Sequence, residues 1–346
     1  MEIYQEELNL FCKTYNLDFL INKSIMITGA SGLIGSYLVD VLMNYNNCNY
    51  DKIKVIAVVR DKKAAQIRFK KYSTKNYFEI VEQDISEASS FTFKSDYIVH
   101  AASNANPNAF DEDPIGTIKA NVNGTMNLLD YARKSGSKRF LYISSSEVYG
   151  EPVIPGTIYN ENSVGLVNQL NPRSCYTESK RMAENICVNY AKQFGFESNI
   201  ARVCFAYGST FTEKDDRVIP QFVRNALNGE NIVLKSTGAL VRSYAYMFDV
   251  VGGMIKILSD GIPGETYNIA NKNSNVSIRD IARSVAKSTG VKVDMQLPKS
   301  EQEKGYSPFS VALLDGAKLE SVGWIPKFDI EQGIKQIVNI LRKEVF

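Results

Sequence analysis

A tyrosine and a lysine at helical spacing, Tyr176 and Lys180, are the pair of side chains in this sequence best suited to moving a proton. Residues four apart on a helix share a face, so the two groups would lie side by side. An ammonium beside a phenol favours the phenolate and lowers the pKa of the tyrosine from about 10 towards neutral pH. Such a tyrosine can take the proton from a sugar hydroxyl while a hydride leaves the same carbon for a nicotinamide ring.

The surroundings of Tyr176 select it as the candidate base. The spacing itself is not specific, because it also joins Tyr50 and Lys54. Tyr176, however, comes after a predicted strand, Arg139–Ser144, that runs into further serines. Ser145 from this run could donate a hydrogen bond to the oxygen that Tyr176 deprotonates. Together with a dinucleotide-binding turn near the start of the chain, these features predict a redox site.

That turn contains three glycines, Gly29, Gly32 and Gly35, between an apolar strand at Ile25–Ile27 and an amphipathic helix at Leu33–Met43. A strand that enters a helix through such a turn leaves backbone N–H groups free to hold a pyrophosphate. The first glycine permits the tight turn, the second the close approach of the phosphates, and the third close packing of helix on strand. The other residues of the turn that we expect to contact the cofactor are Ser31, Leu33 and Ile34.

The second predicted strand, Ile53–Val59, ends at Arg60 and Asp61. An acid at this distance from the glycine turn is expected to bind the adenosine ribose of NAD, whereas an arginine there can hold the 2′-phosphate of NADP. A solvated loop is the third interpretation of the same residues. We therefore predict NAD as the cofactor, with Arg60 at its binding site and with NADP as the alternative.

Strands alternate with helices through residue 143, which predicts an α/β fold: a Rossmann-type doubly wound parallel sheet with helices on both faces. Ligands of such sheets bind at the carboxyl ends of the strands. Small or polar residues follow several of the predicted strands. The cofactor contacts expected at these strand ends are Asp84, Ile85, Ala101, Ala102 and Ser144, and the substrate contact expected there is Ser103.

Beyond residue 205 the pattern becomes less regular, with Gly, Pro and polar loops between short helices. This change predicts a smaller C-terminal α/β lobe that binds the substrate. We expect residues 1–205 to form the Rossmann domain, with residues 241–260 returning to it. Residues 206–240 and 261–346 are expected to form the substrate-binding lobe.

Composition excludes several classes of protein. The chain of 346 residues is 44% hydrophobic and 23% charged, and its net charge of +2 gives no reason to expect a nucleic acid or membrane partner. No apolar run approaches the length of a membrane span, and the acidic start lacks the pattern of an export signal. Five scattered cysteines predict a reduced, cytoplasmic protein, and a single histidine argues against a metal site.

The sequence resembles the extended short-chain dehydrogenase/reductase superfamily, in its NAD-dependent nucleotide-sugar epimerase/dehydratase branch. The resemblance runs from the glycine turn to Gly323–Pro326 and is greatest to the UDP-glucuronate decarboxylases (UDP-xylose synthases). The segments that carry it are Thr28–Gly35, His100–Ser103, Asp113–Thr117, Ser145–Gly150, Pro172–Tyr176, Asp216–Ile219 and Arg242–Tyr244.

The resemblance implies a retained nicotinamide that oxidises C4 of the sugar, a second step, and reduction of the 4-keto group. Ser145 matches the hydrogen-bonding Ser/Thr of the family, Tyr176 the base, and Lys180 the lysine that also binds the nicotinamide ribose. Glu147 matches an acid of decarboxylases and 4,6-dehydratases. It is expected to assist at C5.

Other matches and departures concern the substrate. Ser146 stands where 4,6-dehydratases carry an Asp, which argues against dehydration, and Arg242 matches a substrate-binding arginine. Arg217 is a further substrate candidate, with a solvated helix arginine as the alternative. Phe205 replaces a sugar-contacting Asn of the relatives, and Ser307–Asp315 is apolar where decarboxylases carry diphosphate-binding arginines. These departures weaken the assignment to UDP-glucuronate and leave the redox residues unchanged.

The prediction is therefore an NAD-dependent enzyme that oxidises a nucleotide sugar at C4 and then decarboxylates it, in polysaccharide biosynthesis. Epimerisation and 4,6-dehydration are the alternatives for the second step. An NADPH-dependent keto-sugar reductase and a non-catalytic NAD-binding regulator are the alternatives of other classes. The resemblance also implies a homodimer packed through the helices that carry Asn121 and Tyr176.

Overall fold

The computed structural model describes residues 2–87, 91–105, 107–154, 156–213, 215–296 and 311–342. Its main sheet has seven strands in the order β11-β7-β5-β4-β1-β2-β3, and every neighbouring pair is parallel. The strands are β1 (Ser24–Thr28), β2 (Lys54–Val59), β3 (Phe78–Glu82), β4 (Tyr97–His100), β5 (Arg139–Ser145), β7 (Ser198–Val203) and β11 (Thr266–Ile269).

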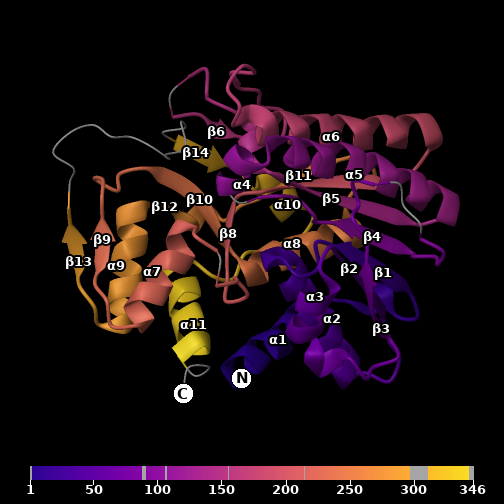
Figure 1. Ribbon diagram of the computed structural model, residues 1–346, viewed down its shortest axis with the longest axis horizontal. Helices are drawn as coiled ribbons and strands as arrows, with labels where there is room; N and C mark the ends of the chain where they lie inside the picture. The colour runs from indigo at the N-terminus through magenta and orange to yellow at the C-terminus, as the bar shows by residue number, and fades with distance from the viewer. Residues whose placement is uncertain are drawn as a thin grey trace.

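Helices cover both faces of this sheet (Figure 1). One layer contains α5 (Pro114–Ser135) and α6 (Ser174–Phe194), which pack side by side. The other contains α2 (Leu33–Cys48) and α8 (Met247–Asp260), with α1 (Glu2–Thr14) outside them. None of the helices in the described ranges has the length and hydrophobicity needed to cross a membrane.

Two apolar clusters, one on each face, follow from the alternation of side chains along the strands. On β1, Ile25 and Ile27 belong to the cluster under α2 and α8, while Met26 belongs to the cluster under α5 and α6. On β5, Leu141 belongs to the cluster under α2 and α8, and Tyr142 to the cluster under α5 and α6. Strands buried on both faces read as continuous apolar runs, which is why the sequence identifies them well.

The rest of the chain forms a second region, which lies to the left of the main sheet in Figure 1. Its larger sheet runs β12-β10-β14-β6, with β8 also paired to β10, and β9 pairs with β13. Its strands are β6 (Ile158–Tyr159), β8 (Phe205–Tyr207), β9 (Ile232–Leu234), β10 (Val241–Tyr246), β12 (Asn275–Ser277), β13 (Val293–Met295) and β14 (Val311–Leu314). Its helices are α7 (Val218–Leu227), α9 (Ile278–Thr289) and α11 (Ile330–Arg342), whereas α10 (Ala317–Ser321) packs on β11 of the main sheet.

Short helices complete the description. Two α-helices, α3 (Lys62–Arg68) and α4 (Pro107–Glu112), follow β2 and β4. The 3-10 helices are η1 (Asp18–Leu20), η2 (Lys70–Tyr72), η3 (Ser146–Tyr149) and η4 (Lys272–Ser274). Of these, η3 matters most, because it continues directly from β5 into the serine-rich segment.

The predicted Rossmann-type doubly wound sheet is confirmed. The domain boundaries expected from the sequence differ from the observed elements in three places. Strand β11 falls in the range 261–346 but forms the edge of the main sheet beside β7, and β6 falls in 1–205 but pairs with β14. Within 241–260, β10 lies in the second sheet while α8 packs on β5 and β7. The chain thus crosses between the two regions, so we propose the two-domain division with these three elements reassigned.

Candidate active site

Two glycines of the first turn are required by backbone packing. Gly29 has φ +65°, and a Cβ there would lie 2.7 Å from the Cα of Ala102, at the end of the neighbouring strand. A Cβ at Gly35 would lie 2.4 Å from the carbonyl oxygen of Gly29. Side chains at either position would therefore separate the turn from β4 or from α2. The expected roles in the tight turn and in helix packing agree with this geometry.

The third glycine, Gly32, begins α2 and is less closely packed than the other two. A Cβ there would meet only the Gly29 oxygen, at 3.3 Å, and no side chain caps the helix. The first intrahelical bond is donated by Ser36 N to Gly32 O at 2.9 Å, so the preceding N–H groups of the first turn are orphan donors. The first turn carries no acidic residue. A helix terminus of this kind fits the pyrophosphate of a dinucleotide. The donors that would hold it belong to Leu33, Ile34 and Gly35, next to Ser31.

The ends of β1 and β4 are joined beside this turn. Thr28 Oγ1 lies 2.9 Å from His100 Nδ1 and accepts a hydrogen bond from Ala102 N at 3.3 Å. Ala101 and Ala102 are half-buried and small, as a flat ring lying against the backbone requires. Ser103 Oγ is buried and has no hydrogen-bond partner among the described residues, so it can accept a ligand contact.

At the end of β2, the structure separates the two candidate ribose ligands. Asp61 accepts the N–H of Ala64 at 2.9 Å and caps α3, so its carboxylate already serves the fold. Arg60 is exposed and donates to Asn104 Oδ1 at 3.2 Å. Two hydrogen bonds from Ser86 lower the pKa of Asp84, and the charge of Arg60 lowers it further. Arg60 and Asp84 therefore lie near each other at this edge.

Ile85, also expected at the cofactor, is 5% exposed and packs against α5. A Cβ at Gly124 would lie 2.7 Å from its Cδ1. Ile85 O accepts a hydrogen bond from Asn127 at 3.0 Å. Its side chain thus faces the apolar core under α5, and only its backbone remains near the strand ends.

Ser144 is a second residue whose side chain serves the fold. Its hydroxyl donates to Glu184 Oε1 at 2.5 Å, and Glu184 also pairs with Arg202 at 2.7 Å. The hydroxyl of Ser144 is therefore part of a network between β5, α6 and β7. The expected cofactor contact of Ser144 stays a prediction, and because Glu184 already binds the hydroxyl, we assign that contact to the backbone of Ser144.

The predicted catalytic side chains lie together where α6 passes the end of β5. Tyr176 is 7% exposed, and the hydroxyl of Ser145 is hydrogen-bonded to its side chain. Ser145 also accepts the N–H of Glu147 at 3.2 Å, which fixes the start of η3. Lys180 Nζ donates to Ile143 O at 2.8 Å and lies 5.8 Å from the centre of the Tyr176 ring.

The expected low pKa of Tyr176 is wrong for the structure as described. Burial raises the pKa of Tyr176 and the charge of Glu147 raises it further, while the Ser145 hydrogen bond and the charges of Arg217 and Arg173 lower it. Burial also lowers the pKa of Lys180 to about 7, against the opposing effect of Glu184. Spacing on a helix gave the neighbourhood of phenol and ammonium correctly. It could not predict the burial of both groups, which raises the pKa of Tyr176 and lowers the pKa of Lys180.

Charged side chains surround this cluster. Glu147 Oε2 pairs with Arg173 Nη1 at 3.3 Å, and Arg242 lies 4.5 Å over the ring of Phe205, with its Nε buried and unpartnered among the described residues. Arg217 donates to both oxygens of Asp215, from Nε at 2.8 Å and from Nη2 at 2.5 Å. The side chain of Arg217 is thus paired with Asp215 and stays 36% exposed.

Two residues of the cluster were missed from the sequence. Arg173 stands three positions before Tyr176, and Phe110 stacks on the Tyr176 ring with centroids 4.6 Å apart and planes at 22°. The position of Arg173 close to the candidate base in the sequence could have identified it as a site residue. Nothing in the sequence could have identified Phe110, because only the fold brings α4 to the site. Ser146 is buried in η3, and Ser307–Ser310 of the apolar segment lie outside the described residues.

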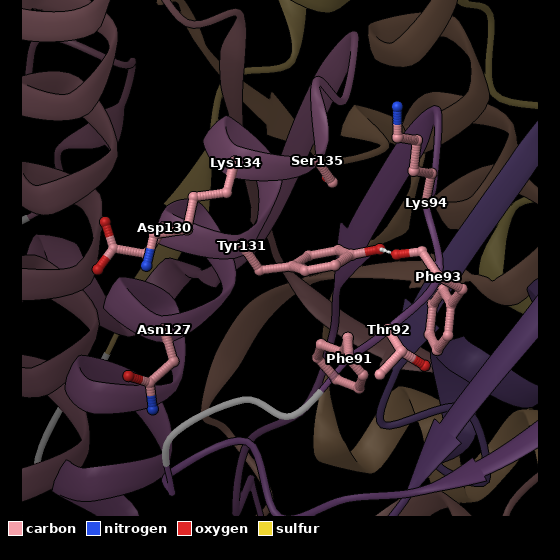
Figure 2. A pocket seen from close by; sticks show the side chains of 9 residues that line it. All are labelled: Phe91, Thr92, Phe93, Lys94, Asn127, Asp130, Tyr131, Lys134 and Ser135. Atoms are coloured by element: carbon pink, nitrogen blue, oxygen red, sulfur yellow. Dashed lines mark hydrogen bonds between the residues drawn. The ribbon is translucent and has the colours of Figure 1, made fainter.

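A pocket of about 400 Å³ lies elsewhere, between the segment before β4 and the C-terminal half of α5 (Figure 2). Tyr131 crosses it and donates to Phe93 O at 2.8 Å. The lining residues Phe91–Lys94 directly precede β4, so the pocket lies at the amino ends of the strands, away from the glycine turn at their carboxyl ends. We assign it no part in the chemistry.

Comparison with known proteins identifies the family of the chain. The family model described as "NAD dependent epimerase/dehydratase family" matches residues 25–270. UDP-glucuronic acid decarboxylase 6 of Arabidopsis thaliana is 33% identical over 317 residues, which cover 91% of this chain and 88% of the relative. UDP-glucuronic acid decarboxylase 1 of Danio rerio is 31% identical and covers 93% of this chain and 73% of the relative.

Solved structures with the same fold include a UDP-glucose 4-epimerase of Thermotoga maritima, with a TM-score of 0.78 and 23% identity over 93% of this chain and 100% of the other. A dTDP-glucose 4,6-dehydratase of Streptomyces venezuelae, DesIV with NAD bound, has a TM-score of 0.77 and 26% identity over 92% of this chain and 97% of the other.

Proposed function

Because this chain belongs to the NAD-dependent epimerase/dehydratase family, we propose that it oxidises UDP-glucuronate at C4 and decarboxylates it to UDP-xylose. The sequence predictions of this family, of an enzyme and of NAD as cofactor are confirmed by these relatives. The observation that supports decarboxylation best is the 33% identity over 91% of this chain to a UDP-glucuronic acid decarboxylase, and Glu147 lies close enough to Tyr176 to influence it.

In this proposal each side chain has a defined task. NAD, when bound, would supply the acceptor for the C4 hydride and give the hydride back in the last step. Tyr176 would take the proton of the C4 hydroxyl, provided that the positive charges of the nicotinamide and of Lys180 counter the burial that raises its pKa, and Ser145 would hold the same oxygen by a hydrogen bond. Lys180, anchored on Ile143 O, would bind the nicotinamide ribose and support the tyrosinate. Glu147 would donate the proton that C5 gains after carbon dioxide leaves.

The dinucleotide would lie along the carboxyl ends of the central strands. Its pyrophosphate would rest on the first turn of α2, and its flat rings against the small residues after β4. The proposed cofactor contacts are Gly29, Ser31, Gly32, Leu33, Ile34, Gly35, Arg60, Asp84, Ala101, Ala102, Tyr176 and Lys180, together with the backbone of Ile85 and Ser144. The proposed substrate contacts are Ser103, Ser146 and Arg242, with Arg217 acting through its charge.

The test is mass spectrometry of products after incubation of the NAD-loaded protein with UDP-glucuronate. Loss of carbon dioxide to give a UDP-pentose supports the proposal. An isomer of unchanged mass would indicate epimerisation, and loss of water would indicate dehydration. Either outcome would overturn decarboxylation while leaving oxidation at C4 intact.

A second candidate, an NADPH-dependent keto-sugar reductase, is favoured by one observation. The end of β2 presents Arg60, while the carboxylate of Asp61 is used as a helix cap. A reductase would consume NADPH in proportion to product, whereas a decarboxylase recycles its bound cofactor. Absorbance of the reduced nicotinamide during turnover distinguishes the two.

We further propose a homodimer that packs through α5 and α6. Large apolar side chains are exposed on the outer faces of both helices. They are Ile115, Ile118, Met126, Met182 and Val188, with exposed fractions from 37% to 60%. Burial of such a patch favours association. Light scattering should give twice the chain mass, and Met126→Glu should shift the protein towards monomers.

A cytoplasmic location in polysaccharide biosynthesis is the remaining part of the proposal. Its support is the absence of any disulfide among the cysteines of the described residues, since free cysteines persist in reducing compartments. Fractionation of the native cells, with the protein detected by antibody, tests the location. Recovery in a secreted fraction would contradict it.

A further inference from the structure

Arg173 completes a continuous set of contacts to the candidate base. Its Nη1 lies 3.3 Å from Glu147 Oε2, and its guanidinium lies 5.4 Å from the centre of the Phe110 ring. Phe110 is 1% exposed and stacks on Tyr176. The side chains of Arg173 and Glu147 keep 24% and 15% of their exposure. The ion pair is therefore accessible to a ligand, while the ring beneath fixes the plane of the guanidinium.

The ion pair lies beside a second arginine. Glu147 and Arg173 act with opposite signs on both Tyr176 and Arg242, so all four groups share one neighbourhood. Asp111 also acts on the adjacent Cys175, and the nearby Arg217 is paired with Asp215. The neighbourhood therefore holds two arginines, Arg173 and Arg242, and the Nε of Arg242 is buried without a partner among the described residues.

We propose that Arg173 is a specificity-determining residue that binds a carboxylate on the sugar of the substrate and gives up Glu147 when it does so. This inference rests on the proposed function, because it takes a nucleotide sugar as the ligand. The incoming carboxylate replaces one anion at Arg173 with another, so the guanidinium keeps a charged partner. Glu147 is thereby released from its ion pair beside Tyr176, where it can act on the sugar ring. A neutral hexose leaves the Glu147–Arg173 pair closed.

A purely structural role for the ion pair predicts different changes in ligand affinity when either residue is replaced. If Arg173 served only to hold Glu147, its removal would affect all sugars alike, and removal of the Glu147 charge would not strengthen binding of an anion. In the exchange described above, Glu147 competes with the substrate carboxylate. Loss of its charge should then tighten binding of the anionic sugar, while loss of Arg173 should weaken it.

The experiment measures dissociation constants of UDP-glucuronate and UDP-glucose by calorimetry on the NAD-loaded protein. We expect Arg173→Met to weaken the binding of UDP-glucuronate about 10- to 100-fold and the binding of UDP-glucose less than about threefold. Glu147→Gln should tighten UDP-glucuronate several-fold, and Arg173→Lys should restore part of the preference. The matched control is Arg283→Met, which removes an arginine from an exposed ion pair with Asp280 on α9.

Several results would overturn the inference. They are equal weakening of both ligands by Arg173→Met, an unchanged preference in that variant, or weaker UDP-glucuronate binding in Glu147→Gln. If Arg173→Met does not fold by thermal melting, Arg173→Lys and Glu147→Gln carry the test. A wild type that prefers UDP-glucuronate through Arg173 but releases no carbon dioxide would refute the proposed function alone. Binding of neither ligand would refute both.

Discussion

One end of the candidate site is built mainly from backbone contacts, and the other mainly from contacts between side chains. At the dinucleotide end, the close contacts join backbone atoms: Gly35 lies against the carbonyl of Gly29, and Gly29 against Ala102. At the sugar end, they join charged and aromatic side chains, such as Glu147 with Arg173. The first end depends on the absence of side chains, and the second on their identity.

This difference predicts how each end responds to mutation. A backbone-built site tolerates changes of nearby side chains but no added Cβ, and its damage appears as lost stability or lost cofactor. A site built from side chains can lose its chemistry while the fold and the cofactor affinity stay unchanged. Variants at the two ends should therefore separate into two phenotypes.

The largest effect is expected for Tyr176→Phe. Loss of the phenolic hydroxyl removes the proposed base and should lower turnover about a thousandfold, within the range for general base catalysis. The phenyl ring keeps its stack on Phe110, so NAD affinity and melting temperature should change little. Product formation by chromatography and NAD binding by fluorescence measure the two quantities.

The matched control lies on the same helix. Tyr190 donates its hydroxyl to Asp130 on α5 at 2.9 Å, and Tyr190→Phe should leave turnover unchanged. Equal losses in both variants would show that the tyrosine hydroxyls of α6 serve the fold. The contrast between the two ends would then fail.

The second prediction contrasts two glycines of one turn. A Cβ at Gly35 would lie 2.4 Å from backbone, so Gly35→Ala should destabilise the protein by about 3 kcal/mol through overpacking. A Cβ at Gly32 would meet only the Gly29 oxygen, at 3.3 Å, so Gly32→Ala should lose much less stability than Gly35→Ala. It should nevertheless weaken NAD binding at least about tenfold, because the methyl group occupies the approach to the N–H donors. Denaturant unfolding and NAD titration measure these effects. Normal NAD affinity in Gly32→Ala would place the pyrophosphate elsewhere.

The same contrast explains what the sequence could predict. Strands such as Lys54–Val59 and the turn after β1 follow from local apolar runs and glycine spacing, and the sequence identified them. The sequence also identified Tyr176 and Ser145, because each stands in a recognisable segment. It did not predict that the side chain of Ser144 binds Glu184 or that the side chain of Asp61 binds the N–H of Ala64. A sequence pattern predicts where a residue lies, but it does not show which other groups of the protein already bind its side chain.

Contacts between segments that are distant in the sequence were the other feature that the sequence could not predict. Phe110 reaches Tyr176 only because α4 packs beside α6, and Glu147 finds Arg173 only where η3 meets the start of α6. The pKa of Tyr176 likewise depends on burial by elements distant in sequence. Strand β11 joined the main sheet from a range assigned to the lobe, because its partner β7 lies more than sixty residues earlier.

The third prediction concerns the pH dependence of stability. Burial lowers the pKa of Lys180 to about 7 in the folded protein, below its value of 10.5 when unfolded. Between these values the unfolded chain binds more protons, so the contribution of Lys180 to stability rises with pH. The stability of wild type relative to Lys180→Met should increase by about 2 kcal/mol from pH 7 to pH 9. Parallel urea titrations at several pH values measure it. A constant difference would mean that Lys180 keeps an ordinary pKa and that the sugar end is less dry than described.

The smallest effect is expected at Phe205, whose ring lies beside Arg242 at the sugar end. Arg242 lies 4.5 Å over this ring, and such a contact contributes about 0.5 to 1 kcal/mol at a partly exposed site. Phe205→Leu keeps an apolar side chain but removes the attraction, so Arg242 should lose its fixed position. We expect KM for UDP-glucuronate to rise about two- to fivefold with kcat unchanged. Phe211→Leu, which removes a ring near Arg224 instead, is the control. A fall in kcat for Phe205→Leu would mean that the ring acts on the reacting carbon rather than through Arg242, and the sugar end would then depend on shape as well as on charge.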